Sequence, residues 1–391
     1  MTAKKISMDL VDEGLARNAA ESQATQPHRP IDLDFLVDKT EGHEARRMKT
    51  SKAEIERIDY ARDQIPRWIR EVIDTSLAIE EQDARSAGSL GFMTRALVSA
   101  TMPYKDPKTK VFERRNGALA LTILSPKGVP YGKYPRLLLS WLVTEAVTKR
   151  SNVIVLGDTL ADFLKSAVGV VATGGASGTQ TRLSEQMERL FTSMVSVERR
   201  DQTGEGRSFS FENITLVNRG RIDARDAQRF DSLGAIDSPT EPRNDDNASE
   251  LWKSRKIVDA GKWDSEVELT ERFFRECIET PVPLDLRAYR TLSAAPMAMD
   301  IYAWVTYRSS YVKRATRPIP WQSLQHQFGS GSPFTEQGIR DFKKAFKRNL
   351  DVVRIVYPGL KVDESGDSSG LILLPSATHV PKLANVQKKL F

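Results

Sequence analysis

The stretch from Tyr134 to Arg200 constrains the fold more than any other part of the chain, because it encodes several short elements in a fixed order. Apolar residues at helical spacing predict a first helix over Tyr134–Val147. Pro135 fits the first turn of that helix, where its missing N–H costs nothing. The apolar run Val153–Leu156 ends at a glycine, so it predicts a short buried strand.

Two more helices and two extended segments follow. Thr159 and Asp162 form a Thr-x-x-Asp start signal for the second helix. A glycine-rich turn leads into a third helix over Thr179–Thr192, and the chain is then extended over Ser193–Val197 and Phe209–Leu216. This order is that of a winged-helix module, whose third helix can enter the major groove of DNA.

The third helix has a polar face of mixed charge opposite its apolar one. Glutamates stand among the arginines on that face, whereas a helix that reads DNA usually shows more positive charge. A DNA-contacting face and a merely solvated face therefore both stay open. The residues of this helix that would contact DNA are Thr179, Gln180, Arg182 and Arg189.

The second half of the chain repeats the pattern. It predicts helices over Met299–Lys313, Ile319–Phe328 and Thr335–Leu350, and two strands, Val352–Tyr357 and Leu371–Leu374, that would flank a polar wing loop. Two modules with the same order of elements form an internal repeat, which is stronger evidence for the winged-helix prediction than either copy alone. The predicted fold class is α+β, with two tandem winged-helix domains preceded by a largely disordered and helical N-terminal region.

The helix Thr335–Leu350 is the sharpest candidate site. Five basic residues minus two acidic ones, Glu336 and Asp341, give this window a charge of +3. Lysine and arginine can neutralise phosphates, and arginine or glutamine can read base edges. A basic solvated face is the alternative. The candidate DNA contacts are Gln337, Arg340, Lys343, Lys344, Lys347 and Arg348.

Composition and pattern set the domain boundaries. The first residues are polar, and Pro66 starts or breaks a helix in the next segment. Farther on, Gly91–Met102 and Leu251–Leu269 read as strands, and Asn116 with Gly117 predicts a hairpin. The prediction is a disordered tail over residues 1–50, a helical extension over 51–88, winged-helix domain 1 over 89–229, a linker over 230–250 and winged-helix domain 2 over 251–391.

The overall charge favours an anionic partner such as nucleic acid. The 391 residues carry 58 basic and 52 acidic side chains, a net charge of +6, so the distribution of charge matters more than its sum. The only cysteine, Cys277, excludes a disulfide within the chain and fits a reducing cytosol. No apolar run approaches the ~20 residues of a membrane span, and we expect no signal peptide and no membrane partner.

No constellation of catalytic or metal-binding residues stands out. The four histidines form no His-x-His pair and no metal-ligand spacing with cysteine. Neither Gly132-Lys133 nor Gly261-Lys262 is followed by Ser or Thr, so a phosphate-binding loop of the Walker type is absent from the sequence. The glycine-rich turn 174–178 could cradle a phosphate, but glycine and serine are ordinary turn residues. The sequence therefore predicts no enzyme, no cofactor and no metal.

Segments in both halves resemble the RepA-type replication initiators of bacterial plasmids. Individually these segments are mostly core residues, and their order is what makes the resemblance specific. It extends roughly from Gly91 to Pro381. The segments are Tyr131–Leu139, Trp141–Val147, Leu156-Gly157, Thr173–Gly175, Thr181–Leu183, Gln186-Met187, Phe273-Phe274, Pro281–Asp285, Met299–Trp304, Gln327–Gly329, Val356–Pro358 and Leu371–Pro381.

The resemblance implies an initiator that binds direct repeats (iterons) in double-stranded DNA at a plasmid origin, and that acts in the bacterial cytoplasm. It implies opening of the adjacent duplex, recruitment of the host initiator and replicative helicase, and homodimers that repress while monomers initiate. The family has no catalytic residues to carry over. By position, the helix Thr335–Leu350 would read the repeats, and the helix Thr179–Thr192 would contact the DNA backbone or another subunit.

Three other functions stay open from the sequence. A winged-helix transcriptional repressor without initiator activity would bind a single operator rather than origin repeats. A primase or nicking enzyme would incorporate nucleotides or cleave a strand with a metal, for which the ligands are missing. A protein-interaction scaffold would not retard DNA even at low salt.

Overall fold

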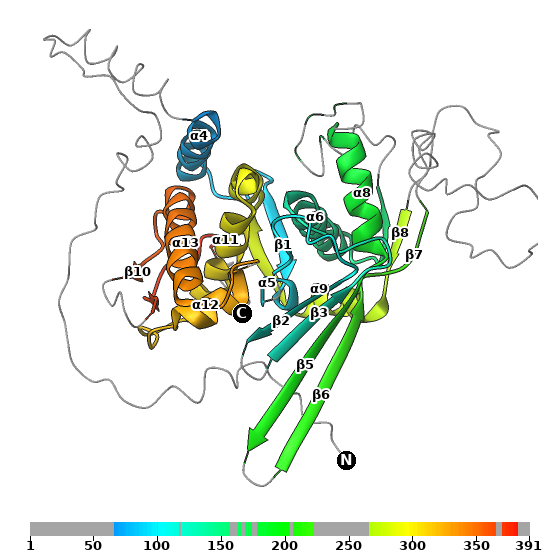
Figure 1. Cartoon of the computed structure of the whole chain (residues 1–391). Coiled ribbons are helices and arrows are strands. Elements are labelled where there is room, and N and C mark those ends of the chain that lie inside the picture. Colours follow the sequence, from blue (N-terminus) through cyan, green and yellow to red (C-terminus); the bar gives the residue numbers. More distant parts are fainter. Residues whose placement is uncertain are drawn as a thin grey trace, which may run out of the picture.

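Helix α6 (Lys133–Lys149) lies at the centre of the computed structural model, because its side chains are apolar on nearly all sides. Leu137, Leu138 and Leu142 are at most 1% exposed. A helix that is apolar all round is stable only when other elements surround it. In Figure 1, α6 lies between β1 (Leu90–Thr94) and α8 (Thr179–Phe191), and it packs against both.

The structure describes most of the chain beyond its first sixty-five residues. The predicted disordered tail, most of the helix predicted after Thr159 and the predicted linker lie outside the described residues. The described ranges are 66–99, 101–116, 119–156, 178–203, 206–221, 266–329, 331–364 and 370–381, with residues 163, 165, 169, 171 and 173.

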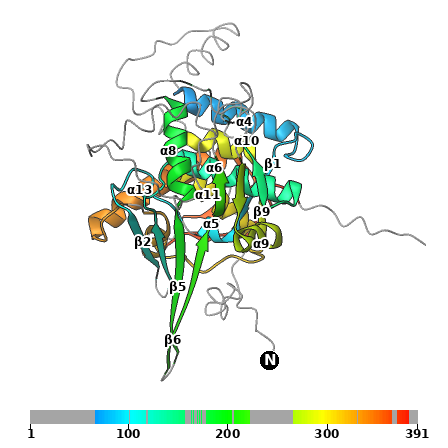
Figure 2. The ribbon, with the colours of Figure 1, turned by 90° about the vertical axis from the view of Figure 1, so that its right-hand side faces the viewer.

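A four-stranded antiparallel sheet covers one side of the molecule, in the order β2 (Val111–Asn116), β3 (Leu119–Leu124), β5 (Met194–Thr203) and β6 (Gly206–Thr215). The pairing of β2 with β3 confirms the predicted hairpin. β5 and β6 pair along their whole length. Figures 1 and 2 show that the β5–β6 hairpin projects well beyond the rest of the described chain.

Two smaller sheets join segments that are far apart in the sequence. β4 (Val153–Val155), β8 (Glu266–Leu269) and β7 (Val217–Arg221) form one sheet in that order. β1 pairs with β9 (Pro281–Asp285) in the other, antiparallel and in register over all five residues. The strands β8 and β9 come from the range expected for domain 2, but they pair with strands from the range expected for domain 1.

The second half of the chain is mainly helical. α11 (Pro296–Ser309), α12 (Trp321–Phe328) and α13 (Glu336–Val356) are its principal helices, and β10 (Val362–Asp363) pairs with β11 (Ile372–Leu373). Ile319 forms an isolated antiparallel bridge with Leu371, beside β11. The other helical elements are α4 (Arg67–Glu81), α5 (Arg95–Ser99), α9 (Glu271–Glu279), α10 (Leu286–Thr291) and the 3₁₀ turn Leu292–Ala294.

Several predicted helices are confirmed to within a few residues. They are α6, α8, α11 and α12, whereas α13 begins as predicted but ends six residues later, at Val356. The predicted buried strand Val153–Leu156 corresponds to β4, in which Ile154 is buried and Val153 and Val155 are exposed. Pro66 stands at the N-cap of α4, so the proline starts this helix rather than breaking it. Residues 51–65 of the predicted helical extension lie outside the described part.

The predicted strand Val352–Tyr357 is wrong. These residues are the last turns and the C-cap of α13. Val352, Val353 and Val356 are buried, and they continue the apolar face of the helix against α4 and α11. Packing therefore outweighs the modest helix penalty of β-branched residues. The strands in the range of the predicted wing are instead β10 and β11, which contain only two residues each.

Two further strand predictions need correction. Over Gly91–Met102 the strand is confined to β1, because the chain enters α5 at Arg95. Within Leu251–Leu269 the described strand is β8, which begins at Glu266.

A buried ion pair links α6 to α11. Arg136 Nε and Nη2 donate to the two carboxylate oxygens of Asp300 at 2.8 and 2.7 Å. The same guanidinium donates to the carbonyl oxygens of Met102, Pro103 and Gly132. Burial would lower the pKa of Arg136, but the charge and hydrogen bonds of Asp300 raise this pKa above its usual value. The N–H groups of the Arg136 guanidinium thus all have acceptors, and the pair lies where the two halves of the chain meet.

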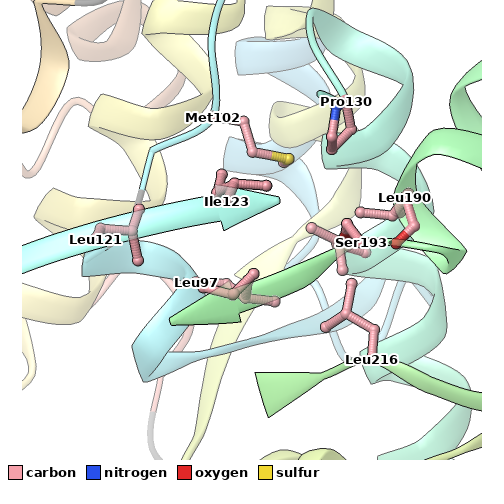
Figure 3. Close-up of a pocket in the computed structure, with 10 residues that line it drawn as sticks. Leu97, Met102, Leu121, Ile123, Pro130, Leu190, Ser193 and Leu216 are labelled. Atoms are coloured by element: carbon pink, nitrogen blue, oxygen red, sulfur yellow. Dashed lines mark hydrogen bonds between the residues drawn. The ribbon is translucent and has the colours of Figure 1, made fainter. Parts of the chain in front are cut away.

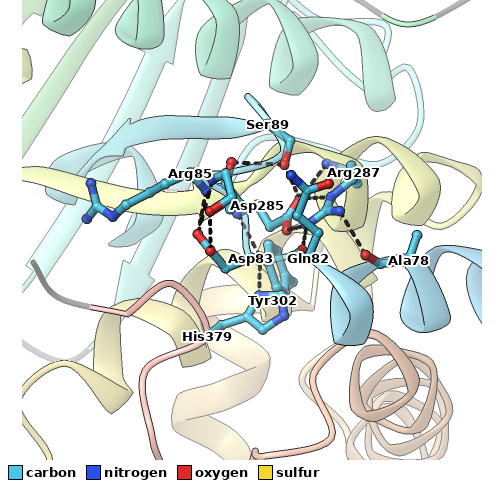
Figure 4. Close-up of polar contacts among 11 residues, drawn as sticks. Ala78, Gln82, Asp83, Arg85, Ser89, Asp285, Arg287, Tyr302 and His379 are labelled. Carbon is cyan, nitrogen blue, oxygen red and sulfur yellow. Dashed lines mark hydrogen bonds and ion pairs between the residues drawn. The ribbon is translucent and has the colours of Figure 1, made fainter.

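A second polar cluster ties α4, the β1–β9 sheet and the C-terminal segment together (Figure 4). Asp285 is 1% exposed and accepts from Arg287 Nη2 at 2.7 Å and from Ser89 Oγ at 3.2 Å. Arg287 also donates to the carbonyl oxygens of Ala78 and Gln82, which belong to the C-terminal end of α4. The backbone N–H of Asp285 donates to Tyr302 Oη, which lies 2.6 Å from His379 Nδ1.

Candidate nucleic-acid interface

Helix α13 separates an apolar face from a basic one. Thr335 caps its N-terminus, because the Thr335 hydroxyl accepts from Gly338 N at 3.1 Å. Phe342, Phe346 and Leu350 are at most 1% exposed and fix the orientation of the helix. The candidate residues are therefore held on the outer side. Gln337, Arg340 and Lys344 are exposed, and Lys343, Lys347 and Arg348 are half-buried.

The exposed polar groups at the start of α13 bond to one another. Gln337 Nε2 donates to Asp341 at 2.9 Å, and Arg340 Nη2 donates to Gln337 Oε1 at 3.1 Å. The Arg340–Glu336 pair is long, at 3.8 Å, and its side chains are 65% and 92% exposed. Exposed pairs of this kind contribute about 0–1 kcal/mol. An incoming phosphate or base edge can replace them at little cost.

The basic residues farther along α13 are partly neutralised. Lys343 and Lys347 place their Nζ atoms 5.3 and 5.8 Å from the centre of the Trp321 ring, in cation–π geometry. Lys347 also pairs at 3.6 Å with Glu364, which follows β10, and Arg354 pairs with the same carboxylate at 2.6 Å. Glu364 thus holds the C-terminal half of α13 to the segment that follows β10.

The turn between α12 and α13 is tightly held. Gln325 is completely buried, and its Nε2 donates to the Pro333 carbonyl oxygen at 3.0 Å. A Cβ atom at Gly338 would lie 1.9 Å from that oxygen, so only glycine allows this approach of turn and helix. The turn ends in Phe334, which is 64% exposed and stacks on His326 with ring centres 4.5 Å apart.

Helix α8 presents fewer available groups than α13. Leu183, Met187 and Leu190, on the apolar face of the helix, are buried. Arg182 is exposed and Gln180 is half-buried. Thr179 Oγ1 donates to the Val171 carbonyl oxygen and accepts from Thr173 N, both at 2.8 Å, so this hydroxyl anchors the start of the helix.

Arg189 is occupied by internal contacts. Its Nη2 donates to Glu185 at 2.6 Å, and its Nη1 lies 3.4 Å from Asp106 and 3.3 Å from the Val129 carbonyl oxygen. The guanidinium also lies over the Tyr131 ring, and the side chain is 15% exposed. These contacts join α8 to the loop before α6. They leave few donors for a phosphate.

A second basic surface escaped the sequence-based prediction. The loop after α11 exposes Lys313, Arg314 and Arg317. The loop is fixed to β11, because Thr316 N donates to the Leu373 carbonyl oxygen at 2.9 Å. The signal lies in charge rather than periodicity: residues 301–335 contain four basic side chains and no acidic one.

A small apolar cavity lies between the sheet and the helices (Figure 3). Met102, Ile123, Leu190 and Leu216 are among the residues that point into it, and its volume is about 20 Å³. Ligand pockets measure roughly 300–1,000 Å³. This cavity is therefore a packing defect of the core and cannot hold a nucleotide.

The described residues contain no group of three or more His, Cys, Asp or Glu side chains placed to hold a metal ion. Among their helices, none is both long and apolar enough to cross a membrane.

The statistical model of one protein family, described as plasmid-encoded RepA protein, matches residues 129–235 and 227–323. Together the two matches cover about half of the chain. The chain belongs to the RepA family. This is a family of plasmid replication initiators, as the resemblance in the sequence led us to expect. The match runs from the loop before α6 to the start of α12, so α13 and the wing lie beyond it.

Comparison with other proteins adds little to the family assignment. No protein with a curated description matches the chain. A crystal structure of RctB domains 2–3 is 15% identical, covers 68% of this chain and 82% of its own, and has a TM-score of 0.37. A second, of selenomethionine derivatives of the same two domains, is 15% identical, covers 70% and 93%, and has a TM-score of 0.38. Scores this low support no statement about the present chain.

Proposed function

We propose that this initiator binds direct repeats at its plasmid origin through two winged-helix modules. Module 1 consists of α6, β4, α8 and the β5–β6 hairpin, and module 2 consists of α11, the Ile319 bridge, α12, α13, β10 and β11. The described elements of module 2, and those of module 1 on either side of its predicted second helix, support this proposal by their order. They lie within the proposed domains, residues 89–229 and 251–391, and β8 completes a sheet of module 1.

The capped, basic N-terminal half of α13 carries this proposal. The N-terminal residues of a recognition helix contact base edges in the major groove. Gln337 and Arg340 are exposed there and bond only weakly to their neighbours, and Lys344 extends the same face. Arginine and glutamine are the side chains that read guanine and adenine edges, and lysine neutralises phosphate.

The two modules contribute unequally. We assign base reading to α13, with Lys343, Lys347 and Arg348 as additional phosphate contacts. Helix α8 has the secondary role, in which Arg182 and Gln180 contact the DNA backbone. Arg189 and Thr179 serve the fold in this proposal, because internal partners already take up most of their donors.

The remaining parts of the proposal rest on family membership. They are opening of the duplex beside the repeats, recruitment of the host initiator and replicative helicase, and repression of the initiator's own gene by a homodimer. Each is a property of initiators of this type. Each would place the protein on plasmid DNA in the bacterial cytoplasm.

Gel retardation of the purified full chain tests the DNA-binding step. The probe is the origin region of the plasmid that encodes the protein, with its direct repeats intact, and the control is the same DNA with the repeats scrambled. We expect preferential binding to the repeats that persists at moderate salt, although affinity falls steeply as salt rises. Equal, salt-labile binding to both DNAs would contradict repeat recognition.

Plasmid maintenance separates an initiator from a repressor of the same fold. A plasmid that carries the origin and depends on this protein should replicate in its presence. Binding to a single operator at the gene, without support of replication, would favour the repressor.

A further inference from the structure

Two exposed apolar residues precede the helices α8 and α13 in the sequence. Phe334 is 64% exposed and Val171 is 78% exposed, the highest values among the large hydrophobic side chains of the described residues. Phe334 immediately precedes the N-cap of α13. Val171 lies eight residues before the start of α8, so its position differs from that of Phe334, although its carbonyl oxygen accepts from Thr179 at the start of that helix. Single exposed apolar residues are common on protein surfaces, so exposure alone assigns no role.

The position of Phe334 gives its exposure a meaning. The residue before an N-cap often packs against the fourth helical residue, here Ile339, and stabilises the helix start. Such packing buries the side chain, whereas most of the Phe334 ring faces solvent. Stacking on His326 covers one face of the ring, with the two planes inclined by 25°. The structure thus holds the ring without burying it.

The turn that carries Phe334 is rigid. Gln325 binds the carbonyl oxygen of Pro333, Gly338 lies against the same group, and Thr335 caps the helix that follows. A fixed apolar ring costs little conformational entropy when it meets a partner. Gln337 and Arg340, the side chains suited to base edges, lie on the first turns of the same helix.

One DNA group matches an apolar ring in this place. The major groove offers hydrogen-bonding edges on every base pair, and its apolar feature is the C5-methyl group of thymine. Phenylalanine is among the side chains that make this contact. We propose that Phe334 packs against a thymine methyl group when α13 enters the major groove, and that Phe334 thereby helps to determine which sequence is bound. The inference rests on the proposed function, because it requires α13 to enter the groove.

Replacement of thymine by deoxyuridine tests this contact, because it removes only the methyl group. Duplexes are selected from a random-sequence pool by binding to the full chain, and a selected duplex is then amplified with either dTTP or dUTP. We expect the wild type to bind the uracil duplex about fourfold more weakly for each thymine methyl group that Phe334 would cover. Phe334→Ala should bind the thymine duplex more weakly than the wild type does, and should lose the part of the discrimination between the duplexes that comes from the methyl group under Phe334.

Two further variants distinguish this contact from other effects of the substitutions. Phe334→Leu keeps an apolar side chain and should retain discrimination between the duplexes. Leu77→Ala removes an exposed apolar side chain from α4, which packs against the C-terminal part of α13, and should discriminate as the wild type does. Because uracil also alters the stiffness of DNA, the loss of discrimination in Phe334→Ala is the decisive result.

The outcomes separate this inference from the proposed function. Equal binding of both duplexes by the wild type, or undiminished discrimination by Phe334→Ala, would overturn the thymine contact while leaving DNA binding intact. A lower melting temperature of Phe334→Ala with unchanged discrimination would assign Phe334 to the helix start alone. Failure of the wild type to enrich any duplex would instead reject the proposed function.

Discussion

Arg136 shows how a single residue can hold the two halves of the chain together. Its side chain is 2% exposed, and its partner Asp300 is 164 residues away in the sequence. Sequence periodicity places both residues on helices, but it carries no information about a pair at that separation. The buried pair between Arg136 and Asp300 could therefore not be predicted from the sequence.

Removal of Asp300 should be strongly destabilising. Asp300→Ala leaves the Arg136 guanidinium buried without its counter-charge, which costs about 3–5 kcal/mol of unfolding free energy. Glu271→Ala is the matched control, because it breaks the Arg275–Glu271 pair, whose side chains are 62% and 73% exposed. That change should cost less than about 1 kcal/mol. Denaturant unfolding measures both, and similar small losses would show that the buried pair contributes little.

His379 should make stability depend on pH. Burial lowers its pKa to about 4, with Asp285 and Arg287 acting in opposite directions, whereas the unfolded value is about 6.5. Its Nδ1 lies 2.6 Å from the Tyr302 hydroxyl. Between the folded pKa of about 4 and the unfolded pKa of about 6.5, the folded chain thus binds fewer protons than the unfolded chain. The stability that is present above pH 6.5 is therefore lost as the pH falls toward 4. The loss is about 3 kcal/mol.

Unfolding free energies between pH 7 and pH 4 check the effect of His379. Other groups titrate in the same range, so the informative quantity is the difference between the wild type and His379→Gln. The variant should show a shallower loss of stability as the pH falls. Parallel curves for the two proteins would rule out His379 as the source.

At the scale of elements, α13 shows which helices and strands a sequence pattern can predict and which it cannot. Its repeating apolar residues predicted the helix and its basic face. The pattern failed at Val352, where a β-branched run resembled a strand, and at the wing, whose two-residue strands are too short to show a period. Phe334 and the basic loop after α11 were missed for a similar reason, since a single exposed ring and an irregular loop have no periodicity.

The outer face of α13 should contribute to DNA binding without supporting the fold. Lys344 is exposed and Arg348 is half-buried, so both side chains can reach solvent. Lys344→Ala with Arg348→Ala should lower the slope of log affinity against log salt by about 0.9 for each phosphate that is no longer neutralised. The melting temperature should stay within a few degrees of the wild type. Unchanged affinity would reject this helix as the reader.

The carboxylate that follows β10 should restrain the same helix. Glu364 pairs with Lys347 and Arg354, so Glu364→Gln should free Lys347 for a phosphate and raise the salt slope by about 0.9. Asp351→Asn removes a negative charge from the same Arg354 but leaves the Glu364–Lys347 pair in place, and should raise the slope less than Glu364→Gln does. In a Lys347→Ala background, Glu364→Gln should have no effect on the slope. If Glu364→Gln, Asp351→Asn and Glu364→Gln in the Lys347→Ala background all raised the slope equally, the effect would come from the overall charge of the protein and not from release of Lys347.

At the scale of the whole molecule, strands from the two halves of the chain share two sheets. The β1–β9 sheet takes one strand from each half, and β8 lies between β4 and β7. Helix α4 precedes module 1 in the sequence, yet Ser76 Oγ donates to the Ile355 carbonyl oxygen of α13 at 2.6 Å. Sequence analysis predicted two tandem domains because the spacing of apolar residues indicates only local helices and strands. The sharing of sheets between the two halves depends on pairing between distant segments.

These shared elements should make the described chain unfold as one cooperative unit. Phe346 is completely buried in module 2, and Phe346→Leu should lower the unfolding free energy by about 1–1.5 kcal/mol. If the modules are coupled, native-state hydrogen exchange should show the same loss of protection in α6 of module 1 as in α13. Lys344→Ala, on the exposed face of α13, should change neither helix. Full protection of α6 in Phe346→Leu would mean that the modules unfold separately despite their common sheets.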